Sequence, residues 1–486
     1  MFYIFKIWLA LLFVLVFSAC AQSEQNDSRP NILFILADDL GYADVGFNGA
    51  TDIKTPNLDD LANNGITFTQ AYAAHPFCGP SRAGLLTGRY PHKFGSQFNL
   101  PDIPHSGGLG VPTSETFISE VLQQAGYFTG AIGKWHLGEM KEHHPNNRGF
   151  DEFYGFLPGG HHYHPEMFNK RVDALRQAGR TTLHHYLQPL EHNGTEVRET
   201  EYLTDGLSRE AVNFIAKAEE KKQPFFLYLA YNAPHTPLEA TDADLAKFPN
   251  IKDKKRKTYA AMVYALDRGV KRVVDELKRT GQFDNTLIIF MSDNGGKVSE
   301  GANNGPLRAG KGSVYEGGHR SPMFFHWPKQ IKTTSEYRYL VHALDFFPTF
   351  AALAQAKIAD TIALDGKNIW PAVRDNTVAH QGESYFVMRH RGGLSDVAAH
   401  REQWKAVRVA NGPWALYDVN KDPEEKHNVN EDYPNLLIDM VTEMNAWSWT
   451  HEAPRWFHIH QEGVQWREDS MPRFHETFNL PVQGAR

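Results

Sequence analysis

The sequence predicts an α/β protein with a large, mixed but mostly parallel sheet sandwiched by helices, followed by a smaller antiparallel sheet with a helix. Apolar runs without alternation recur up to about residue 380, a pattern typical of strands buried on both faces. Segments with apolar residues at helical spacing lie between these runs. After about residue 381 short alternating runs are separated by glycine, asparagine and aspartate, which indicates antiparallel strands.

The expected elements follow from these patterns in chain order. Buried strands are expected at residues 31–37, 127–132, 224–230 and 286–291. Helices are expected at residues 57–63, 115–125, 204–218 and 258–280. Residues 139–200 are rich in histidine, glycine and asparagine and predict a long functional loop with little regular structure. The C-terminal part predicts strands near residues 384–388 and 404–409 and a helix near residues 434–444.

Composition excludes several classes of protein. The 486 residues carry 50 Lys+Arg against 57 Asp+Glu, a net charge of −7, and 41% of them are hydrophobic, as in ordinary globular proteins. Disorder, collagen-like structure and a multi-span membrane protein are therefore excluded. Because no broad basic surface is available, we expect no nucleic-acid partner, and an anionic substrate must be held by a few placed cations.

The first 28 residues are expected to lie outside the fold. Lys6 precedes an apolar run at residues 7–17, shorter than the roughly 20 residues that span a bilayer, and Ser-Ala-Cys20 follows. This pattern resembles a bacterial lipoprotein signal, which implies a signal peptide at residues 1–19, a lipid at Cys20 as the only membrane contact, and a tether at residues 20–28. Export to the bacterial cell envelope, in the periplasm or at the outer membrane, is then expected; plain secretion with Cys20 discarded is the alternative.

Polar residues gather where the predicted strands end. They are Asp38 and Asp39, Lys134 and His136, His235, and Asp293 and Asn294. Ligands bind beyond the carboxyl ends of the strands in such sheets, so these side chains are expected to meet. Three carboxylates and an amide oxygen suit Ca²⁺ or Mg²⁺ rather than Zn²⁺. The sequence therefore predicts a metal-dependent site for an anion.

Cys78 lies in the most specific motif of the chain. It starts a Cys-Gly-Pro-Ser-Arg segment that ends at Arg82, and Leu-Leu-Thr-Gly follows at residues 85–88. This motif resembles that of the formylglycine-dependent sulfatases, within the alkaline-phosphatase-like superfamily, and the resemblance extends over nearly the whole chain after residue 28. It implies that a maturation enzyme oxidises Cys78 to formylglycine. Cys20 is the only other cysteine, so Cys78 is expected to have no disulfide partner.

Sulfate transfer explains the need for an aldehyde residue. A serine alkoxide would form a stable sulfated enzyme, whereas a hydrated aldehyde carries two hydroxyl groups on one carbon. One hydroxyl can attack sulfur, and the other can expel sulfate by re-forming the carbonyl. The helix expected from Ser81 onward would place free N–H groups near the transferred group.

The resemblance also assigns the remaining site residues. The metal would be Ca²⁺, ahead of Mg²⁺, and its ligands would be Asp38, Asp39, Asp293, Asn294 and the modified Cys78. The residues that stabilise the sulfate oxygens would be Arg82, Lys134 and Lys311. His235, with Lys311, would protonate the leaving alcohol, and His136 would take a proton from the remaining hydroxyl. The domains implied are a catalytic domain at residues 29–380 and a C-terminal α+β subdomain at residues 381–486.

The substrate is expected to be a sulfated carbohydrate, because an exported enzyme has reason to attack an external polymer. Algal polysaccharides such as ulvan or carrageenan are favoured over glycosaminoglycans, while the sugar and the sulfate position stay open. His161, His162 and His164 are candidates for sugar contacts, with a solvated loop as the alternative. Four tryptophans could stack on sugars but are favoured as packing residues, namely Trp447, Trp449, Trp456 and Trp466. The alternative functions are a phosphodiesterase or phosphonate hydrolase of the same superfamily and a non-catalytic glycan-binding lipoprotein.

Overall fold

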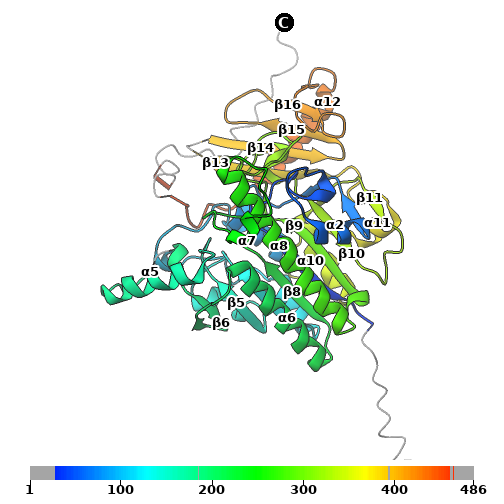
Figure 1. Cartoon of the computed structure of the whole chain (residues 1–486). Coiled ribbons are helices and arrows are strands. Elements are labelled where there is room, and N and C mark those ends of the chain that lie inside the picture. Colours follow the sequence, from blue (N-terminus) through cyan, green and yellow to red (C-terminus); the bar gives the residue numbers. More distant parts are fainter. Residues whose placement is uncertain (1–27, 184, 392–393, 460–462, 465–486) are drawn as a thin grey trace, which may run out of the picture.

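A computed structural model describes residues 28–183, 185–391, 394–459 and 463–464 (Figure 1). The predicted signal peptide, nearly all of the predicted tether and Trp466 lie outside the described residues. The predicted fold class is confirmed, since a large mixed sheet between helices is followed by a separate antiparallel sheet. The domain boundaries stay a prediction.

The large sheet has the strand order β11-β2-β10-β9-β1-β8-β4-β5-β6-β7. Its parallel centre consists of β1 (Asn31–Ala37), β4 (Phe128–Lys134), β5 (Glu152–Phe156), β8 (Phe225–Ala230) and β9 (Thr286–Ser292). Its outer strands are β2 (Ile66–Phe68), β10 (Met323–His326), β11 (Ser335–Tyr337), β6 (Leu190–His192) and β7 (Thr195–Val197). A separate short pair consists of β3 (Ala71–Tyr72) and β12 (Val341–His342). Antiparallel pairing occurs only towards the edges, where β10 and β6 reverse direction.

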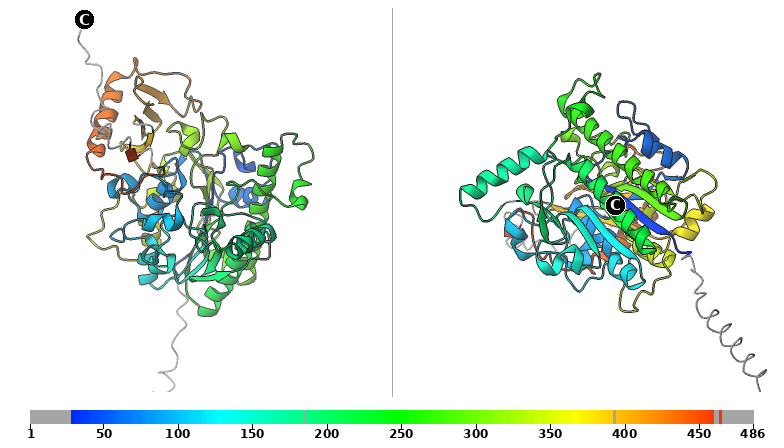
Figure 2. Two further views of the ribbon diagram at one scale, coloured as in Figure 1. Left: turned by 90° about the vertical axis from the view of Figure 1, so that its left-hand side faces the viewer. Right: turned by 60° about the horizontal axis from the view of Figure 1, so that its bottom comes forward.

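Helices cover both faces of this sheet (Figures 1 and 2). The longer ones are α2 (Pro56–Asn63), α3 (Cys78–Thr87), α4 (Ile118–Gln124), α5 (Pro165–Gln177), α6 (Leu203–Lys221), α8 (Lys254–Arg279), α10 (Phe346–Leu353) and α12 (Pro434–Ser448). The short ones are α7 (Asp242–Leu245), α9 (Glu316–His319) and α11 (Trp370–Asp375). Single 3₁₀ turns lie at Gly46–Asn48, Pro91–Phe94, Pro104–Gly108, Lys141–His143, Pro145–Asn147, His185–Leu187, Phe283–Asn285, Val298–Glu300 and Ala343–Asp345.

Strand β1 shows why the apolar runs do not alternate. All of its residues are buried, and alternate side chains enter two separate cores. Phe34 packs its ring against Phe346 and Phe350 of α10. Leu33 and Ile35 point the other way, into the core that α6 and α8 share. Both faces of the strand are therefore apolar, which is the physical cause of the pattern in the sequence.

The excursion at residues 139–200 is more regular than predicted. It contains β5, α5, β6 and β7, and β5 is a parallel partner of β4 in the large sheet. This strand has only five residues, begins with Glu152 and contains Gly155, so its apolar run is too short to stand out in the sequence. A Cβ atom at Gly155 would lie 2.0 Å from the carbonyl oxygen of Gly133, so glycine is required where the two strands pair.

The C-terminal sheet consists of β13 (Tyr385–Arg391), β14 (Leu394–Arg401), β15 (Trp404–Arg408) and β16 (Ala415–Asp418). It packs at one end of the molecule beside α12 (Figure 2). Trp447 of α12 is buried, with ring centroids 5.1 Å from Tyr90 and 5.0 Å from Phe386, and Trp456 is buried against Phe98. Two of the candidate tryptophans therefore pack in cores, whereas Trp449 is 61% exposed.

A buried ionic cluster joins the two sheets. Nζ of Lys405, on β15, lies 3.0 Å from Oε1 of Glu316 on α9 and 2.8 Å from Oε1 of Glu425. Burial is the largest influence on the pKa of Glu316, yet the Lys405 ammonium holds that pKa below its ordinary value. Two histidines, His319 and His400, lie beside this carboxylate in a group that could hold a metal ion. Lys405 already supplies the positive charge there, so the cluster needs no metal to balance Glu316.

No helix in the described part of the chain is both long and apolar enough to cross a membrane.

Candidate active site

Asp38 and Asp293 meet because β1 and β9 are parallel neighbours that end at the same edge of the sheet. Ala37 pairs with Ser292, so the two acidic segments leave their strands at the same level. The backbone N–H of Asp39 donates to Oδ1 of Asp293 over 3.3 Å, and Nδ2 of Asn294 donates to Oδ1 of Asp39 over 2.8 Å. The structure therefore brings the four predicted oxygen ligands together.

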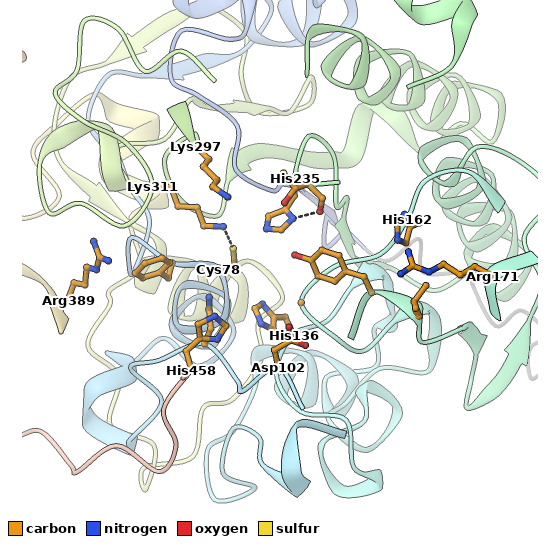
Figure 3. A pocket seen from close by; sticks show the side chains of 16 residues that line it. Cys78, Asp102, His136, His162, Arg171, His235, Lys297, Lys311, Arg389 and His458 are labelled. Atoms are coloured by element: carbon orange, nitrogen blue, oxygen red, sulfur yellow. Dashed lines mark hydrogen bonds between the residues drawn. The ribbon is translucent and has the colours of Figure 1, made fainter. Parts of the chain in front are cut away.

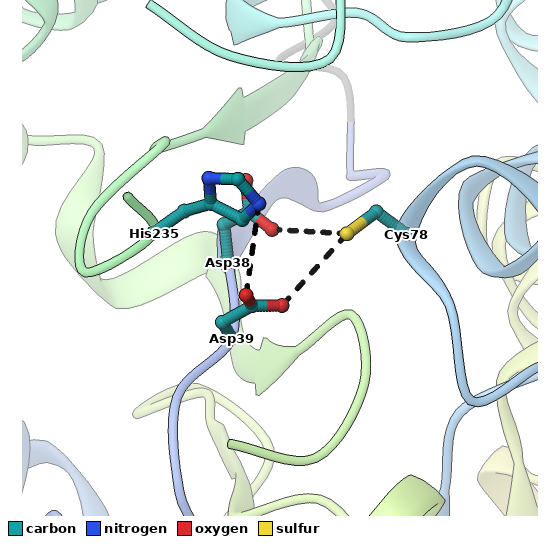
Figure 4. Close-up of side chains that lie close together, drawn as sticks. All are labelled: Asp38, Asp39, Cys78 and His235. Carbon is teal, nitrogen blue, oxygen red and sulfur yellow. Dashed lines mark hydrogen bonds and ion pairs between the residues drawn. The ribbon is translucent and has the colours of Figure 1, made fainter. Parts of the chain in front are cut away.

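Cys78 is the first residue of α3 and points into this group (Figure 4). Its Sγ lies 3.4 Å from Oδ1 of Asp38, 3.8 Å from Oδ1 of Asp39 and 3.0 Å from Nζ of Lys311. The side chain is 1% exposed, and burial raises the pKa of the thiol well above its ordinary value. The start of α3 thus holds residue 78 against the predicted metal ligands.

Three predicted cations surround the carboxylates. Nζ of Lys134, the last residue of β4, lies 2.5 Å from Oδ2 of Asp38. Nζ of Lys311 lies 2.6 Å from Oδ1 of Asp39, and Nε of Arg82 donates to Oδ2 of Asp293 over 2.9 Å. Burial alone would raise the pKa of Asp38, but Lys134 and the other nearby cations hold it below its ordinary value. All three cations that were predicted to bind sulfate therefore lie beside the predicted metal ligands.

The donor atoms fit a hard divalent cation. Oδ1 of Asn294 is buried and accepts no hydrogen bond within the described part of the chain, so it is an amide oxygen with a free coordination position. Burial, followed by the negative charge of Asp38, raises the pKa of Asp293 above its ordinary value, so a further cation beside these carboxylates would favour the charged form of Asp293. Asp38, Asp39, Cys78 and His235 present ligand atoms within 4.8 Å of one another. Oxygen donors in this number suit Ca²⁺ or Mg²⁺.

The two predicted acid–base histidines lie on different sides of Cys78 (Figure 3). Nε2 of His235 lies 3.6 Å from Oδ2 of Asp39, while its Nδ1 is hydrogen-bonded to the carbonyl oxygen of Thr236 over 2.7 Å. Burial lowers the pKa of His235 to about 4. His136 lies beside the start of α3, since a Cβ atom at Gly79 would lie 3.6 Å from its Cε1.

A cavity of about 860 Å³ opens above Cys78 (Figure 3). Four predicted site residues line it: Cys78, His136, His235 and Lys311. Of the candidate sugar-binding histidines only His162 does so, and its Nδ1 lies 2.7 Å from Oε1 of Glu239. His161 instead packs its ring 4.3 Å from that of Phe168, and His164 precedes α5.

Several residues of the cavity were not predicted from the sequence. They include Asn99, Asp102, Arg171, Tyr186, Lys297, Arg389 and His458. Except for Lys297, which comes shortly after β9, none of them follows a strand of the parallel centre of the sheet, the signal that identified His136 and His235, and none lies in the motif that identified Cys78. They come from the 139–200 excursion, from loops, and from the C-terminal part of the chain, so only the packing of these segments brings them to the site.

A buried cysteine at a helix start, carboxylate and amide groups at the ends of two strands and three nearby cations form an arrangement that suits the hydrolysis of an anionic ester. The chain belongs to the sulfatase family. A family model described as Sulfatase matches residues 30–356, and one described as N-sulphoglucosamine sulphohydrolase, C-terminal, matches residues 310–448.

Known sulfatases are similar over most of the chain. The uncharacterized sulfatase YdeN of Escherichia coli K12 is 34% identical over 411 residues, which are 74% of this chain and 68% of that protein. Arylsulfatase J of Mus musculus is 36% identical over 351 residues, 72% of this chain and 56% of that protein. The crystal structure of Ps i-CgsB in complex with k-i-k-neocarrahexaose is 58% identical, with a TM-score of 0.91, over 93% of this chain and all of that one.

Proposed function

We propose that this sulfatase removes sulfate from a sulfated algal polysaccharide of the carrageenan type, or from its oligosaccharides. The observation that carries this proposal is the 58% identity to Ps i-CgsB, which was crystallised with k-i-k-neocarrahexaose. That similarity favours carrageenan over ulvan and over glycosaminoglycans. The cavity of about 860 Å³ supports it, because this volume holds a ligand larger than one sugar ring.

We propose further that Cys78 acts as formylglycine beside a Ca²⁺ ion. Hydrated formylglycine would supply one hydroxyl group that attacks sulfur and a second that releases sulfate as the carbonyl re-forms. The ion, held by Asp38, Asp39, Asp293, Asn294 and residue 78, would supply positive charge to the sulfate oxygens. The hard donor set and the free Oδ1 of Asn294 support this assignment.

The chain's own side chains would bind the sulfate and move the protons. Lys134 and Lys311 hold their ammonium groups beside residue 78, so both would contact oxygens of the transferred group. Nε2 of His235 faces the cavity and would donate a proton to the leaving sugar oxygen. His136, beside the start of α3, would take the proton from the second hydroxyl of residue 78.

Sulfate release from defined oligosaccharides tests this function. Purified protein, co-expressed with a formylglycine-generating enzyme, is expected to release inorganic sulfate from k-i-k-neocarrahexaose, measured by ion chromatography. Mass spectrometry of the peptide that contains Cys78 is expected to show the aldehyde. The Cys78→Ala variant is the matched control. Faster hydrolysis of phosphate or phosphonate esters would favour the alternative hydrolase, and an unmodified Cys78 without sulfate release would favour a glycan-binding protein.

We also propose that the protein is exported and carries lipid at Cys20. The support is the sequence of residues 1–20 and the external location of algal polysaccharides. Fractionation of producing cells tests it. The full chain is expected in the membrane fraction of the envelope and the Cys20→Ala variant in its soluble fraction, whereas release of both forms would support plain secretion.

A further inference from the structure

The cavity carries more positive charge than one sulfate group requires. Arg82, Lys134 and Lys311 are each paired with a carboxylate at the reaction centre. The cavity is also lined by three further cations, which are Arg171, Lys297 and Arg389. Asp102 is the one carboxylate among its described lining residues. In a chain with a net charge of −7, this local excess marks a surface for an anion larger than a single sulfate.

Arg171 differs from the other two cations in having no polar partner among the residues that the structure describes. Nζ of Lys297 lies 3.7 Å from Oε1 of Glu300, and Arg389 donates to the carbonyl oxygen of Gly312. Arg171 makes no hydrogen bond or ion pair with the described residues, although two other arginines near α5 do: Arg176 pairs with Glu196 and Arg198 with Asp173. The guanidinium group of Arg171 therefore keeps its hydrogen-bond donors available.

The geometry of α5 directs Arg171 towards the cavity. Phe168 and Val172 are the buried residues of this helix and anchor one face of it to the body of the protein. At about 100° per residue, Arg171 lies at the edge of that face, whereas Lys170 lies opposite it. Figure 3 shows the guanidinium group of Arg171 across the cavity from Arg389, with Cys78 between them. A substrate centred on Cys78 thus reaches Arg171 with a part other than the sulfate that is removed.

We propose that Arg171 binds a second anionic group of the substrate, a sulfate on a neighbouring sugar, and so makes the enzyme selective for multiply sulfated chains. This inference rests on the proposed function. Guanidinium groups match the planar, multiple hydrogen bonding of oxyanions, and such charge-assisted bonds are stronger than neutral ones. Arg171 is a specificity residue in this proposal, because it contacts the substrate away from the reacting atoms.

Steady-state kinetics on k-i-k-neocarrahexaose test the proposal with four proteins: the wild type, Arg171→Ala, Arg171→Lys and Lys170→Ala. In Arg171→Ala the KM for the hexaose is expected to rise about tenfold while kcat changes by less than about threefold, as expected when one charge-assisted contact to a bound substrate is lost. The KM of Arg171→Lys is expected to lie between that of the wild type and that of Arg171→Ala, because lysine keeps the positive charge. Lys170→Ala removes an equal charge from the other face of α5 and is expected to match the wild type.

Two further measurements separate a specificity role from structural damage. The inhibition constant of inorganic sulfate, which reports its competition with substrate at the reaction centre, is expected to shift by less than about twofold in Arg171→Ala. The difference in KM between this variant and the wild type is expected to shrink as ionic strength rises, because exposed charges are screened by salt. Equal weakening of sulfate inhibition and hexaose binding, or an unchanged KM in Arg171→Ala, would overturn the proposal. A wild type that releases no sulfate from the hexaose would instead overturn the proposed function, and this inference with it.

Discussion

Nζ of Lys311 lies 3.0 Å from Sγ of Cys78, although the two residues are 233 positions apart in the chain. The same ammonium group lies 2.6 Å from Oδ1 of Asp39. Lys311 therefore links the proposed nucleophile to the proposed metal ligands, and in the proposed mechanism its ammonium group lies beside the sulfate that is transferred to residue 78. This contact makes Lys311 the side chain whose loss is expected to affect sulfate transfer most directly.

We expect Lys311→Ala to lower kcat by about 10²–10³-fold, the usual cost of losing one donor to a charge that develops in the transition state. Sulfate release from k-i-k-neocarrahexaose measures the effect. Lys332→Ala, which removes an exposed lysine that does not line the cavity, is the control and is expected to keep full activity. A kcat within a factor of three of the wild type would contradict a role for Lys311 at the transferred group.

We expect Cys78→Ser to permit at most one sulfate transfer per protein molecule. A serine has a single hydroxyl group, so the sulfated residue has no second hydroxyl with which to expel sulfate. Intact-protein mass spectrometry after incubation with substrate should show the sulfated adduct, while sulfate release stops. Continuous turnover by this variant at the wild-type rate would exclude the aldehyde mechanism.

We expect removal of divalent cations to abolish activity and to lower the melting temperature. Without an ion the crowded carboxylates of Asp38, Asp39 and Asp293 repel one another, and Oδ1 of Asn294 is left without a partner among the described residues. Dialysis against a chelator removes the ion and elemental analysis verifies its removal, while sulfate release measures activity and calorimetry measures the melting temperature. Ca²⁺ is expected to restore both properties, and Asn294→Leu is expected to weaken this restoration. Full activity in metal-free protein would contradict the proposed site.

We expect Lys405→Met to destabilise the protein by about 3–5 kcal/mol, because it leaves the buried carboxylate of Glu425 without its cation and leaves Glu316 paired with Arg320 alone. Urea unfolding followed by tryptophan fluorescence measures the change. Lys421→Met, at an 85% exposed side chain, is the matched control and is expected to leave the midpoint unchanged. If both variants unfold at the wild-type midpoint, the cluster does not hold the two sheets together.

We expect the pair of His380 and Asp345 to make stability depend on pH. Nε2 of His380 lies 2.9 Å from Oδ2 of Asp345. Burial opposes the charge on the imidazole, but Asp345 raises the pKa of His380 above its ordinary value of 6.5. The pair thus makes its full contribution to the free energy of unfolding below pH 6.5. This contribution is lost as the pH rises through the higher pKa that His380 has in the folded state. Urea unfolding of the wild type and His380→Asn should differ most at low pH; a difference that grows as pH rises would contradict the assignment.

Much of the fold could be predicted from the sequence, because burial on both faces leaves a local signature. The strands β1, β8 and β9 were identified as unbroken apolar runs, and α6 and α8 by their helical spacing. Strand β5 was missed because five residues with a glycine carry too little pattern. Strand β14 was missed as well, since its sequence, Leu-Ser-Asp-Val-Ala-Ala-His-Arg, shows neither strict alternation nor an unbroken apolar run.

The predicted part of the site is the part that follows a strand or lies in a specific motif. Asp38, Asp39, Asp293 and Asn294 could be identified because parallel strands end at one edge of their sheet. Arg171 and Arg389 could not, because one lies on a helix within a polar excursion and the other on the C-terminal sheet. Neither arginine lies next to a predicted strand end or within a specific motif, so the local sequence gives no sign that it lines a cavity.

The sequence by itself determined the kinds of atoms available, namely the oxidisable cysteine, the hard oxygen ligands and the cations, since these depend only on residue identity and local pattern. Only the tertiary structure decided that β1 lies next to β9, so that Asp39 meets Asp293 across 254 positions of the chain. It also decided that α5 turns Arg171 towards the same cavity. The physical reason is that the order of the strands and the positions of the helices depend on how the apolar faces of the sheet and of the helices pack together. No single segment of the sequence specifies this packing.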